Sequence, residues 1–174
     1  MVSLSSGNRV LQTTISVTKA LAAAGNYAAE DVLSEDAASG TAWVFNAIVP
    51  RNGMSGKIIK AQAICETTAL TPALALYLFT ATPTSALDDN VANTAVIHAD
   101  IANFIGRIEF PALADLGGDS EAVVTPSDET GLLPLPFRCA SADDALYGIL
   151  VTRDAITGET ATDDMTVRLS VEIR

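Results

Sequence analysis

The sequence predicts an all-β protein, an antiparallel β-sandwich of the jelly-roll type with a flexible N-terminal arm. Three observations lead to this prediction. Short apolar segments recur roughly every 12 to 20 residues. Several of them alternate apolar and polar residues, as a strand with one solvated face does. Loops rich in Gly, Pro, Ser, Thr and Asp separate them. About eight such strands fit a jelly roll, and an open barrel is the alternative.

The alternation is clearest in the C-terminal segment "MTVRLSVEIR", which predicts a strand with one buried face. Its apolar set is Met165, Val167, Leu169, Val171 and Ile173. The segment "NFIGRIEF" alternates in the same way, with Phe104, Gly106, Ile108 and Phe110 on one face. Near the N-terminus, "RVLQTTISVTK" predicts another strand that places Leu11, Ile15 and Val17 on one side.

Two segments, "PALALYLFTA" and "DALYGILVTR", are apolar on both faces. Such runs are typical of central strands that a second layer covers. In the first of them, Leu74, Leu76 and Leu78 share one face, while Tyr77 and Phe79 share the other. The sequence therefore predicts that these two strands lie at the middle of the sandwich. A short helix is expected somewhere between residues 91 and 103.

An Asn-Gly pair at Asn52 and Gly53 separates the apolar segment 42–50 from the segment "KIIKAQAICET". Asn and Gly both tolerate positive φ, so this pair predicts a β-hairpin. The second strand of that hairpin is expected to bury one alternating set of residues, namely Ile59, Ala61, Ala63 and Cys65.

The length of 174 residues fits a single domain. We expect residues 1–25 to form an N-terminal arm and the first strand, and residues 26–174 to form one β-sandwich domain. Hydrophobic residues make up 49% of the chain and charged residues only 18%. Such low charge indicates that neighbouring molecules cover part of the surface.

The net charge of −11 argues against partners that carry phosphate. The ten basic residues are scattered along the chain and form no run. An acidic surface repels nucleic acid and anionic lipid, so we expect neither as a partner. The two cysteines, Cys65 and Cys139, are expected to be buried free thiols in a reducing compartment.

The segment "YLFTATPTSALDDN" ends in two Asp residues and an Asn, which raises the question of a metal site. Oxygens from Asp88, Asp89 and Asn90 are the ligands that Ca²⁺ prefers, but the spacing matches no known calcium loop. Asp and Asn are equally typical of a turn, because they bond their own backbone. We favour the turn and therefore expect Asp89→Ala to change little.

Catalytic chemistry has little support in the sequence, and we expect a protein that is not an enzyme and needs no cofactor. His98 is the single histidine, and no Gly-x-Ser-x-Gly segment nominates a nucleophile. The segment "LGGDS" lacks the lysine of a phosphate loop and predicts a turn. Trp43 and the tyrosines are candidates for a sugar-stacking platform, although Trp43 and Tyr147 fit core packing better.

Four segments in a characteristic order carry a resemblance to a known group of proteins. They are "NYAAEDVLSED", "RNGMSGKIIKAQAICET", "ALALYLFTATPTSALDDN" and "DDMTVRLSVEI". In this order they resemble small virion proteins of tailed bacteriophages, over residues 27–174. The pair Ala29-Glu30 precedes Asp31-Val32 where those proteins have a glycine. Several members of that group are capsid decoration (cement) proteins with β-sandwich folds.

The resemblance implies a virion structural protein that stabilises the phage head by bridging capsomers. It implies the major capsid protein as partner, self-association as a homotrimer, synthesis in the host cytoplasm and a place on the capsid surface. We expect two segments to make capsid or subunit contacts, with the residues Arg9, Val10, Leu11, Arg51, Asn52 and Met54. The alternative is a neck, tail or fibre-associated adhesion module that binds a host glycan.

Overall fold

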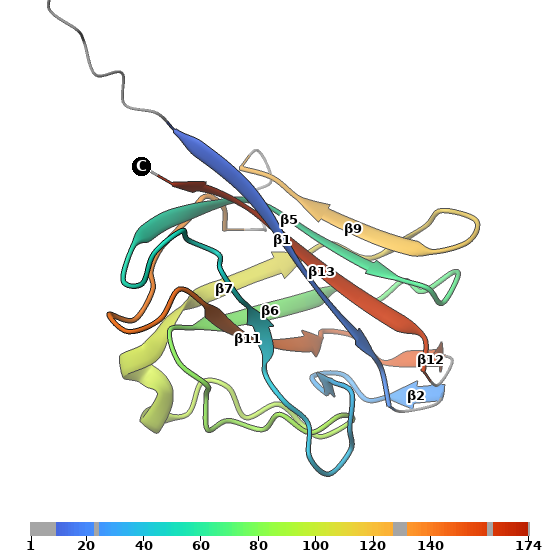
Figure 1. Cartoon of the computed structure of the whole chain (residues 1–174). Coiled ribbons are helices and arrows are strands. Elements are labelled where there is room, and N and C mark those ends of the chain that lie inside the picture. Colours follow the sequence, from blue (N-terminus) through green and yellow to red (C-terminus); the bar gives the residue numbers. More distant parts are fainter. Residues whose placement is uncertain (1–9, 23–24, 127–131, 160–161, 174) are drawn as a thin grey trace, which may run out of the picture.

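A computed structural model of the chain describes residues 10–22, 25–126, 132–159 and 162–173. Within these residues nearly all of the regular secondary structure is β-strand (Figure 1). The strands are β1 (Leu11–Ala20), β2 (Gly25–Tyr27), β3 (Val32–Leu33), β4 (Trp43–Phe45), β5 (Ser55–Cys65), β6 (Leu74–Phe79), β7 (Phe104–Phe110), β8 (Ala114–Asp115), β9 (Ser120–Val124), β10 (Leu135–Arg138), β11 (Leu146–Thr152), β12 (Ile156–Glu159) and β13 (Asp164–Ile173). A 3₁₀ helix, η1 (His98–Asn103), lies within the segment where a short helix is expected.

The strands form two facing antiparallel sheets, which confirms the predicted β-sandwich. One sheet has the order β1-β13-β5-β9-β8, with β10 also paired to β5. The other has the order β3-β11-β6-β7, with β4 also paired to β11. β3 and β4 both pair with β11 and together act as one interrupted strand. Each sheet then contains strands from both ends of the chain, as in a jelly roll. In Figure 1 the β1-β13-β5-β9 layer lies over β7, β6 and β11.

The main core lies between the two sheets and follows the predicted alternation closely. The residues expected on the inner face of β13, from Met165 to Ile173, are all buried. β6 is buried along its whole length, as expected of a central strand. Leu74, Leu76 and Leu78 point into the main core, where burial of each large aliphatic side chain contributes about 2 kcal/mol.

A second, smaller apolar cluster covers the outer face of the β6-containing sheet. It includes Ala75, Tyr77 and Phe79 from β6, and Phe104 packs against it. The ring of Phe104 lies 5.4 Å from that of Phe79. The loop between β6 and β7 supplies the rest of the cover through Leu87 and neighbouring apolar residues. β6 is therefore apolar on both faces because one face meets the opposite sheet and the other meets its own following loop.

The predicted hairpin at Asn52 and Gly53 is wrong. β4 pairs with β11, whereas β5 pairs with β13, β9 and β10, so the connection crosses from one sheet to the other. Gly53 does adopt a positive φ of 70°, as the turn prediction requires. Buried Ile48 and Val49 lead the chain into the core before the turn, and the amide of Gly53 donates to the carbonyl of Asp143. The turn is thus fixed by the loop before β11 instead of by a partner strand.

The buried face of β5 also differs from the prediction at one residue. Ala61, Ala63 and Cys65 are buried as expected, but Ile58 is buried in place of Ile59. The pairing of β5 with β13 shifts register between Ser170 and Val171, which marks a β-bulge. A bulge inserts one residue and exchanges the two faces beyond it. Strict alternation therefore predicts the correct face only on one side of this irregularity.

Small elements complete the structure outside the two main sheets. β2 and β12 pair with each other as a separate two-stranded sheet, and β12 lies in a segment rich in Gly, Thr and Asp that the composition assigns to a loop. β1, from the segment expected to hold an arm and the first strand, pairs with β13 from Leu11 to Ala20. In the part of the chain that the structure describes, no helix has the length and apolar character to span a membrane.

Candidate functional site

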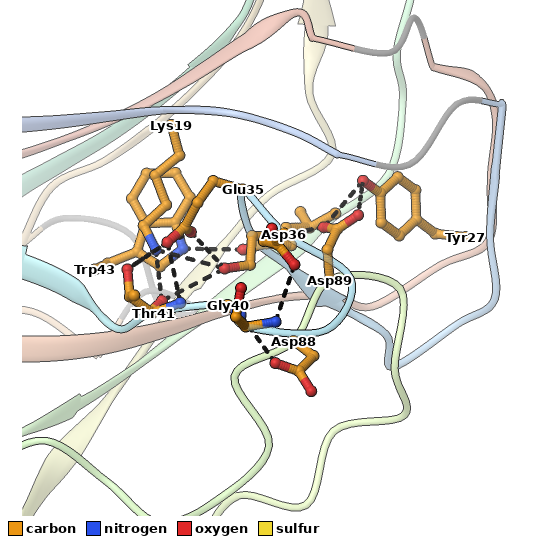
Figure 2. A network of polar contacts seen from close by, with 12 residues as sticks. Lys19, Tyr27, Glu35, Asp36, Gly40, Thr41, Trp43, Asp88 and Asp89 are labelled. Carbon is orange, nitrogen blue, oxygen red and sulfur yellow. Dashed lines mark hydrogen bonds and ion pairs between the residues drawn. The ribbon is translucent and has the colours of Figure 1, made fainter.

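Lys19 is the centre of a buried polar network between β1 and the loop that follows β3 (Figure 2). Its ammonium group donates to the Glu35 carboxylate, to the Thr41 carbonyl and, at 3.1 Å, to the Thr41 hydroxyl. The same nitrogen lies 5.5 Å from the centroid of the Trp43 ring. The indole N–H of Trp43 in turn donates to the carbonyl of Leu33 at 3.0 Å. A buried lysine is tolerated here because each of its donors faces an acceptor or a π-face.

The two charges of this network affect each other's pKa. Burial lowers the pKa of Lys19, and the nearby Glu35 and Asp89 carboxylates oppose that change. Burial acts to raise the pKa of Glu35, but the hydrogen bonds from Lys19, Thr41 and Ser34 outweigh it and hold this pKa at about 2. Glu35 is therefore charged at neutral pH, and its contact with Lys19 ties β1 to the loop after β3.

Asp89 is buried, with 1% of its surface exposed, and accepts three hydrogen bonds from a distant part of the chain. The hydroxyl of Tyr27 donates to both carboxylate oxygens, at 3.0 and 3.2 Å. The backbone N–H of Ser34 donates to the same carboxylate at 2.6 Å. Figure 2 shows the Tyr27 side chain directed at Asp89 from β2. This carboxylate therefore joins the loop after β6 to β2 and β3.

The neighbours of Asp89 extend the same junction along the backbone. The Asp88 carboxylate accepts from the amide of Gly40 at 2.9 Å. The amide of Asn90, a residue with a φ of 57°, donates to the carbonyl of Val32 at 2.9 Å. The three residues Asp88–Asn90 thus bond protein groups between residues 27 and 40. Among the described residues, no group of three or more His, Cys, Asp or Glu is placed to hold a metal ion.

This arrangement changes the expectation that Asp89→Ala would have little effect. That expectation assumes an exposed turn residue whose oxygens bond only nearby backbone. In the structure the Asp89 carboxylate is buried, and its removal leaves the Tyr27 hydroxyl and the Ser34 amide without this acceptor. Unsatisfied buried donors each cost roughly 1–3 kcal/mol, so the substitution is expected to destabilise the fold.

The aromatic residues fill the interior and form no exposed platform. Trp43, Tyr27 and Tyr77 are buried, which confirms core packing for Trp43. Tyr147 is half-buried, and its hydroxyl donates to Asp143 at 2.7 Å. None of the Phe, Tyr and Trp residues of the described segments is classed as exposed. Stacking of a sugar ring needs a well exposed aromatic face, and Phe104 and Tyr147, the least buried of these residues, are each half-buried.

The remaining candidates for chemistry lie far apart in the fold. His98 is exposed at the start of η1. Cys65 and Cys139 are buried thiols that form no disulfide, as predicted. Burial, together with the charges of Asp143 and Asp144, raises the pKa of the Cys139 thiol to about 11. That thiol is protonated at neutral pH and is a poor nucleophile.

The structure brings the two expected contact segments to the same end of the β1-β13-β5 sheet. Leu11 pairs with Ile173 of β13, and Ile173 pairs with Gly56 near the start of β5. Val10 and Leu11 are exposed, at 46% and 52%. Arg9 lies outside the described residues. The other three residues precede β5: Arg51 and Asn52 are exposed, and Met54 packs partly against the core.

An open groove of about 520 Å³ occupies this end of the sandwich. Its lining combines apolar and basic side chains, from Ser55, Gly56, Lys57, Ile105, Pro136, Phe137 and Arg138. Gly56 is required here, because a Cβ at this position would lie 2.9 Å from the Phe137 ring. The groove and the exposed start of β1 together form one surface with apolar character at the end of the sheet.

β1 is an edge strand, with a strand neighbour on one side only in the described structure. From Val10 to Thr18 it carries no charged residue and no proline. Several other strands at sheet edges have protection: β8 and β3 have two residues each, β10 contains Pro136, and β7 carries the Arg107–Glu109 ion pair. Edges that present free N–H and C=O groups without such protection pair readily with another chain.

Comparison with known proteins places this chain in no family: no protein-family model matches it, and no curated protein matches it. One similar solved structure is a chain of the semi-empty virus-like particle of nodavirus from the giant freshwater prawn Macrobrachium rosenbergii. It has 10% identity and a TM-score of 0.29 over 97% of this chain and 96% of that chain. Another, from sacbrood virus of honeybee, has 12% identity and a TM-score of 0.23 over 96% and 72%. Backbones with such TM-scores superpose loosely, and the fold assignment rests on the strand order of the chain itself.

Proposed function

We propose that this protein is a virion structural protein of the capsid decoration (cement) type, which stabilises a phage head by bridging neighbouring capsomers. The observation that carries the proposal is the unprotected edge of β1. Its ten residues lie at the border of the sheet, and exposed Leu11, with exposed Val10 just before the strand, lies at the same end of the sheet as the groove near β5. An edge of this kind is suited to add a strand from a partner or to lie against a partner's sheet.

The chemistry of the rest of the molecule fits a role in association. The main core is buried between the two sheets, and the charged groups around Lys19 bond other groups of the same chain. A protein that binds only the assembled shell shifts the assembly equilibrium toward that shell by mass action. Bridging contacts of this kind need a rigid scaffold and an accessible edge. The two packed sheets supply the scaffold, and β1 supplies the edge.

Binding to isolated shells tests this proposal directly. Shells that lack the protein are mixed with the purified chain, and the bound copies are measured after sedimentation. Leu11→Lys places a charge at the exposed start of β1, and we expect it to weaken binding by at least about tenfold, or roughly 1.4 kcal/mol. Ile101→Lys is the matched control, because Ile101 is an equally accessible apolar residue (56% exposed) on η1.

Two outcomes contradict the proposal. If the wild-type chain fails to bind the shells, the decoration role is wrong. If the chain binds and Leu11→Lys binds as tightly as Ile101→Lys, β1 is not the contact strand. Circular dichroism of both variants shows that each is folded before binding is compared.

A further inference from the structure

A polar pocket of about 170 Å³ lies on the solvent face of the sheet formed by β1, β13 and β5. Five side chains line it: Thr14, Lys60, Gln62, Arg168 and Ser170. They alternate with residues that are buried in the core, such as Ala61 and Leu169, and so all five project outward. The pocket is distinct from the groove near Gly56 at the end of the sheet.

Two cations share this pocket without a carboxylate among its lining residues. The ammonium group of Lys60 makes no hydrogen bond or ion pair to any residue that the structure describes, although its backbone pairs with β13. Arg168 makes one hydrogen bond, from its guanidinium to the Gln62 side-chain oxygen at 3.3 Å. The Gln62 amide nitrogen donates to Glu121, which lies outside the pocket. The chain has 21 acidic and 10 basic residues, so acidic partners are plentiful. It is therefore unusual that two neighbouring basic side chains have none.

The register places the two cations close together. Lys60 is opposite Ser170, and Gln62 is opposite Arg168, so Lys60 and Arg168 are diagonal neighbours on adjacent strands. Diagonal side chains lie about 7–8 Å apart at Cβ, within mutual reach of long side chains, and like charges there are unfavourable. The hydroxyls of Thr14 and Ser170, 3.0 Å from each other, complete the rim. This set of donors fits an oxyanion placed between the two cations, because charge-assisted hydrogen bonds then replace the repulsion.

A second copy of this chain carries a segment suited to that pocket. The turn between β8 and β9 holds Asp115 and Asp119, both exposed, around Leu116, which is 60% exposed. A Cβ added at Gly117 or Gly118 would meet no atom within 4 Å, so the turn stands clear of the rest of the fold. β8 lies at the opposite border of the same sheet from β1. The turn is therefore a projecting, negatively charged segment at the far side of the sheet from the pocket.

We propose that the Lys60–Arg168 pocket binds the carboxylates of the β8–β9 turn of a second copy of this chain. Charge complementarity carries the assignment, because copies with a net charge of −11 repel each other except where a basic site receives an acidic one. The two surfaces differ, so the contact is head-to-tail and generates a ring or an open chain of subunits. This contact includes the Thr14 side chain of β1, but it uses neither the free backbone edge of that strand nor the groove near Gly56, and it stands independently of the virion role.

Sedimentation velocity of the full chain tests the contact. We expect the wild-type protein to self-associate at about 50 mM NaCl and to dissociate at about 500 mM, where the Debye length falls well below 10 Å. The double variant Lys60→Ala/Arg168→Ala is expected to raise the dissociation constant at least about tenfold. Arg107→Ala is the control, since it removes one positive charge from the opposite sheet, in a surface ion pair that contributes little stability.

The double variant Asp115→Asn/Asp119→Asn tests the other side of the contact. Asn keeps the shape of Asp and the hydrogen bond that Asp115 accepts from Gly117. We expect it to weaken self-association as much as the pocket variant. A charge exchange, Lys60→Glu with Asp119→Lys, is expected to restore part of the association that Lys60→Glu alone removes.

Several results would overturn the proposal. A chain that stays monomeric at low salt has no such contact, even if the pocket takes up inorganic sulfate as an adventitious ion. Self-association that survives both double variants lies elsewhere on the molecule. A loss in the pocket variant without a loss in the Asp115→Asn/Asp119→Asn variant would exclude the β8–β9 turn as the occupant. Thermal unfolding of each variant confirms that the fold is retained.

Discussion

The Tyr27 hydroxyl donates a hydrogen bond to the Asp89 carboxylate at 3.0 Å, across 62 positions of the sequence. The contact joins β2 to the loop that follows β6, and Ser34 of the adjoining loop bonds the same carboxylate. A segment with the composition of a metal loop thus acts as a structural junction. It holds the loops beside β3 against the loop that covers the outer face of β6.

Asp89→Ala is expected to lower the free energy of unfolding by about 3 kcal/mol, because it leaves two buried donors without their acceptor. Tyr27→Phe, which removes one donor and keeps the carboxylate, is expected to cost about 1 kcal/mol. Urea denaturation followed by tryptophan fluorescence measures both. Asp119→Ala is the control for loss of an exposed carboxylate. It is expected to be neutral when all variants are measured at about 500 mM NaCl, where contacts between copies do not contribute. An Asp89→Ala variant as stable as this control would contradict the structural role.

Gly40→Ala is expected to destabilise the same junction. A Cβ at Gly40 would lie 2.2 Å from the Leu87 carbonyl oxygen, and this atom belongs to the backbone and cannot rotate away. The loop must shift, at a cost of about 1–3 kcal/mol. Gly118→Ala is the matched control, because its Cβ would meet no atom within 4 Å. Equal melting temperatures for the two variants would show that residues 40 and 87 are not in contact.

The alternation in β13 makes a separate prediction about the core. Val167→Asp or Leu169→Asp places an unpaired charge at a fully buried position and is expected to prevent stable folding. Ser16→Asp introduces the same charge at an exposed position of β1, the neighbouring strand, and is expected to keep the fold. Far-UV circular dichroism and solubility distinguish the two results. A folded Leu169→Asp protein would mean that this face of β13 does not meet a core.

The pKa of Glu35 predicts how stability depends on pH. Its folded-state value of about 2 is below the value of about 4.3 expected in an unfolded chain. A carboxylate with a lowered pKa stabilises the fold above its unfolded pKa, and this contribution is lost as the pH falls through the folded value. Burial acts to raise the pKa of Asp100, but hydrogen bonds from Thr84 and Ser85 outweigh it and lower this pKa. The hydrogen bond from Tyr147 lowers the pKa of Asp143 against the opposing effect of burial. We therefore expect stability to fall steadily between about pH 4.5 and pH 2.

Replacing Lys19 tests the origin of that pH dependence. Lys19→Met keeps most of the buried volume but removes the ammonium group that bonds Glu35. The pKa of Glu35, measured by carboxyl NMR titration, is expected to rise toward its ordinary value. A Glu35 pKa that stays at about 2 in this variant would mean that the Thr41 and Ser34 hydroxyls alone account for the lowering.

The thiol of Cys139 is expected to react slowly in the folded protein. It is buried, and its pKa of about 11 leaves almost no thiolate at pH 7. Cys65 is buried as well. A thiol reagent is therefore expected to label neither cysteine rapidly under native conditions and to label both after unfolding in urea. Rapid labelling of Cys139 in the native state would contradict its burial.

The sequence predicts the parts of this fold that depend on local pattern. The buried face of β13 and the double-sided burial of β6 follow from periodicity alone, since each residue's environment repeats along the strand. The Asn52–Gly53 turn shows the limit of such reasoning. Its positive φ is a local property and is predicted correctly, but the sheet that each flanking strand joins depends on distant residues.

The polar junction lies beyond the reach of pattern analysis for the same reason. Asp89 has the composition of a turn residue, and its partners Tyr27 and Ser34 are 62 and 55 positions away. The residues near Lys19 in the sequence do not show which group bonds its ammonium, because the partner Glu35 comes from another element. One signal was available: Lys19 occupies the same alternating face of β1 as Ile15 and Val17, so the strand period places it inward.

The proposed decoration role is tested most directly by the copy number of this chain in purified virions. The virions are those of the virus whose genome encodes the chain. Calibrated mass spectrometry compares it with the major capsid protein. A decoration protein is expected at on the order of hundreds of copies, because it occupies symmetry-related sites over the whole shell. About a dozen copies or fewer would place it at the neck or tail instead. Absence of the chain from the particles would contradict a virion role altogether.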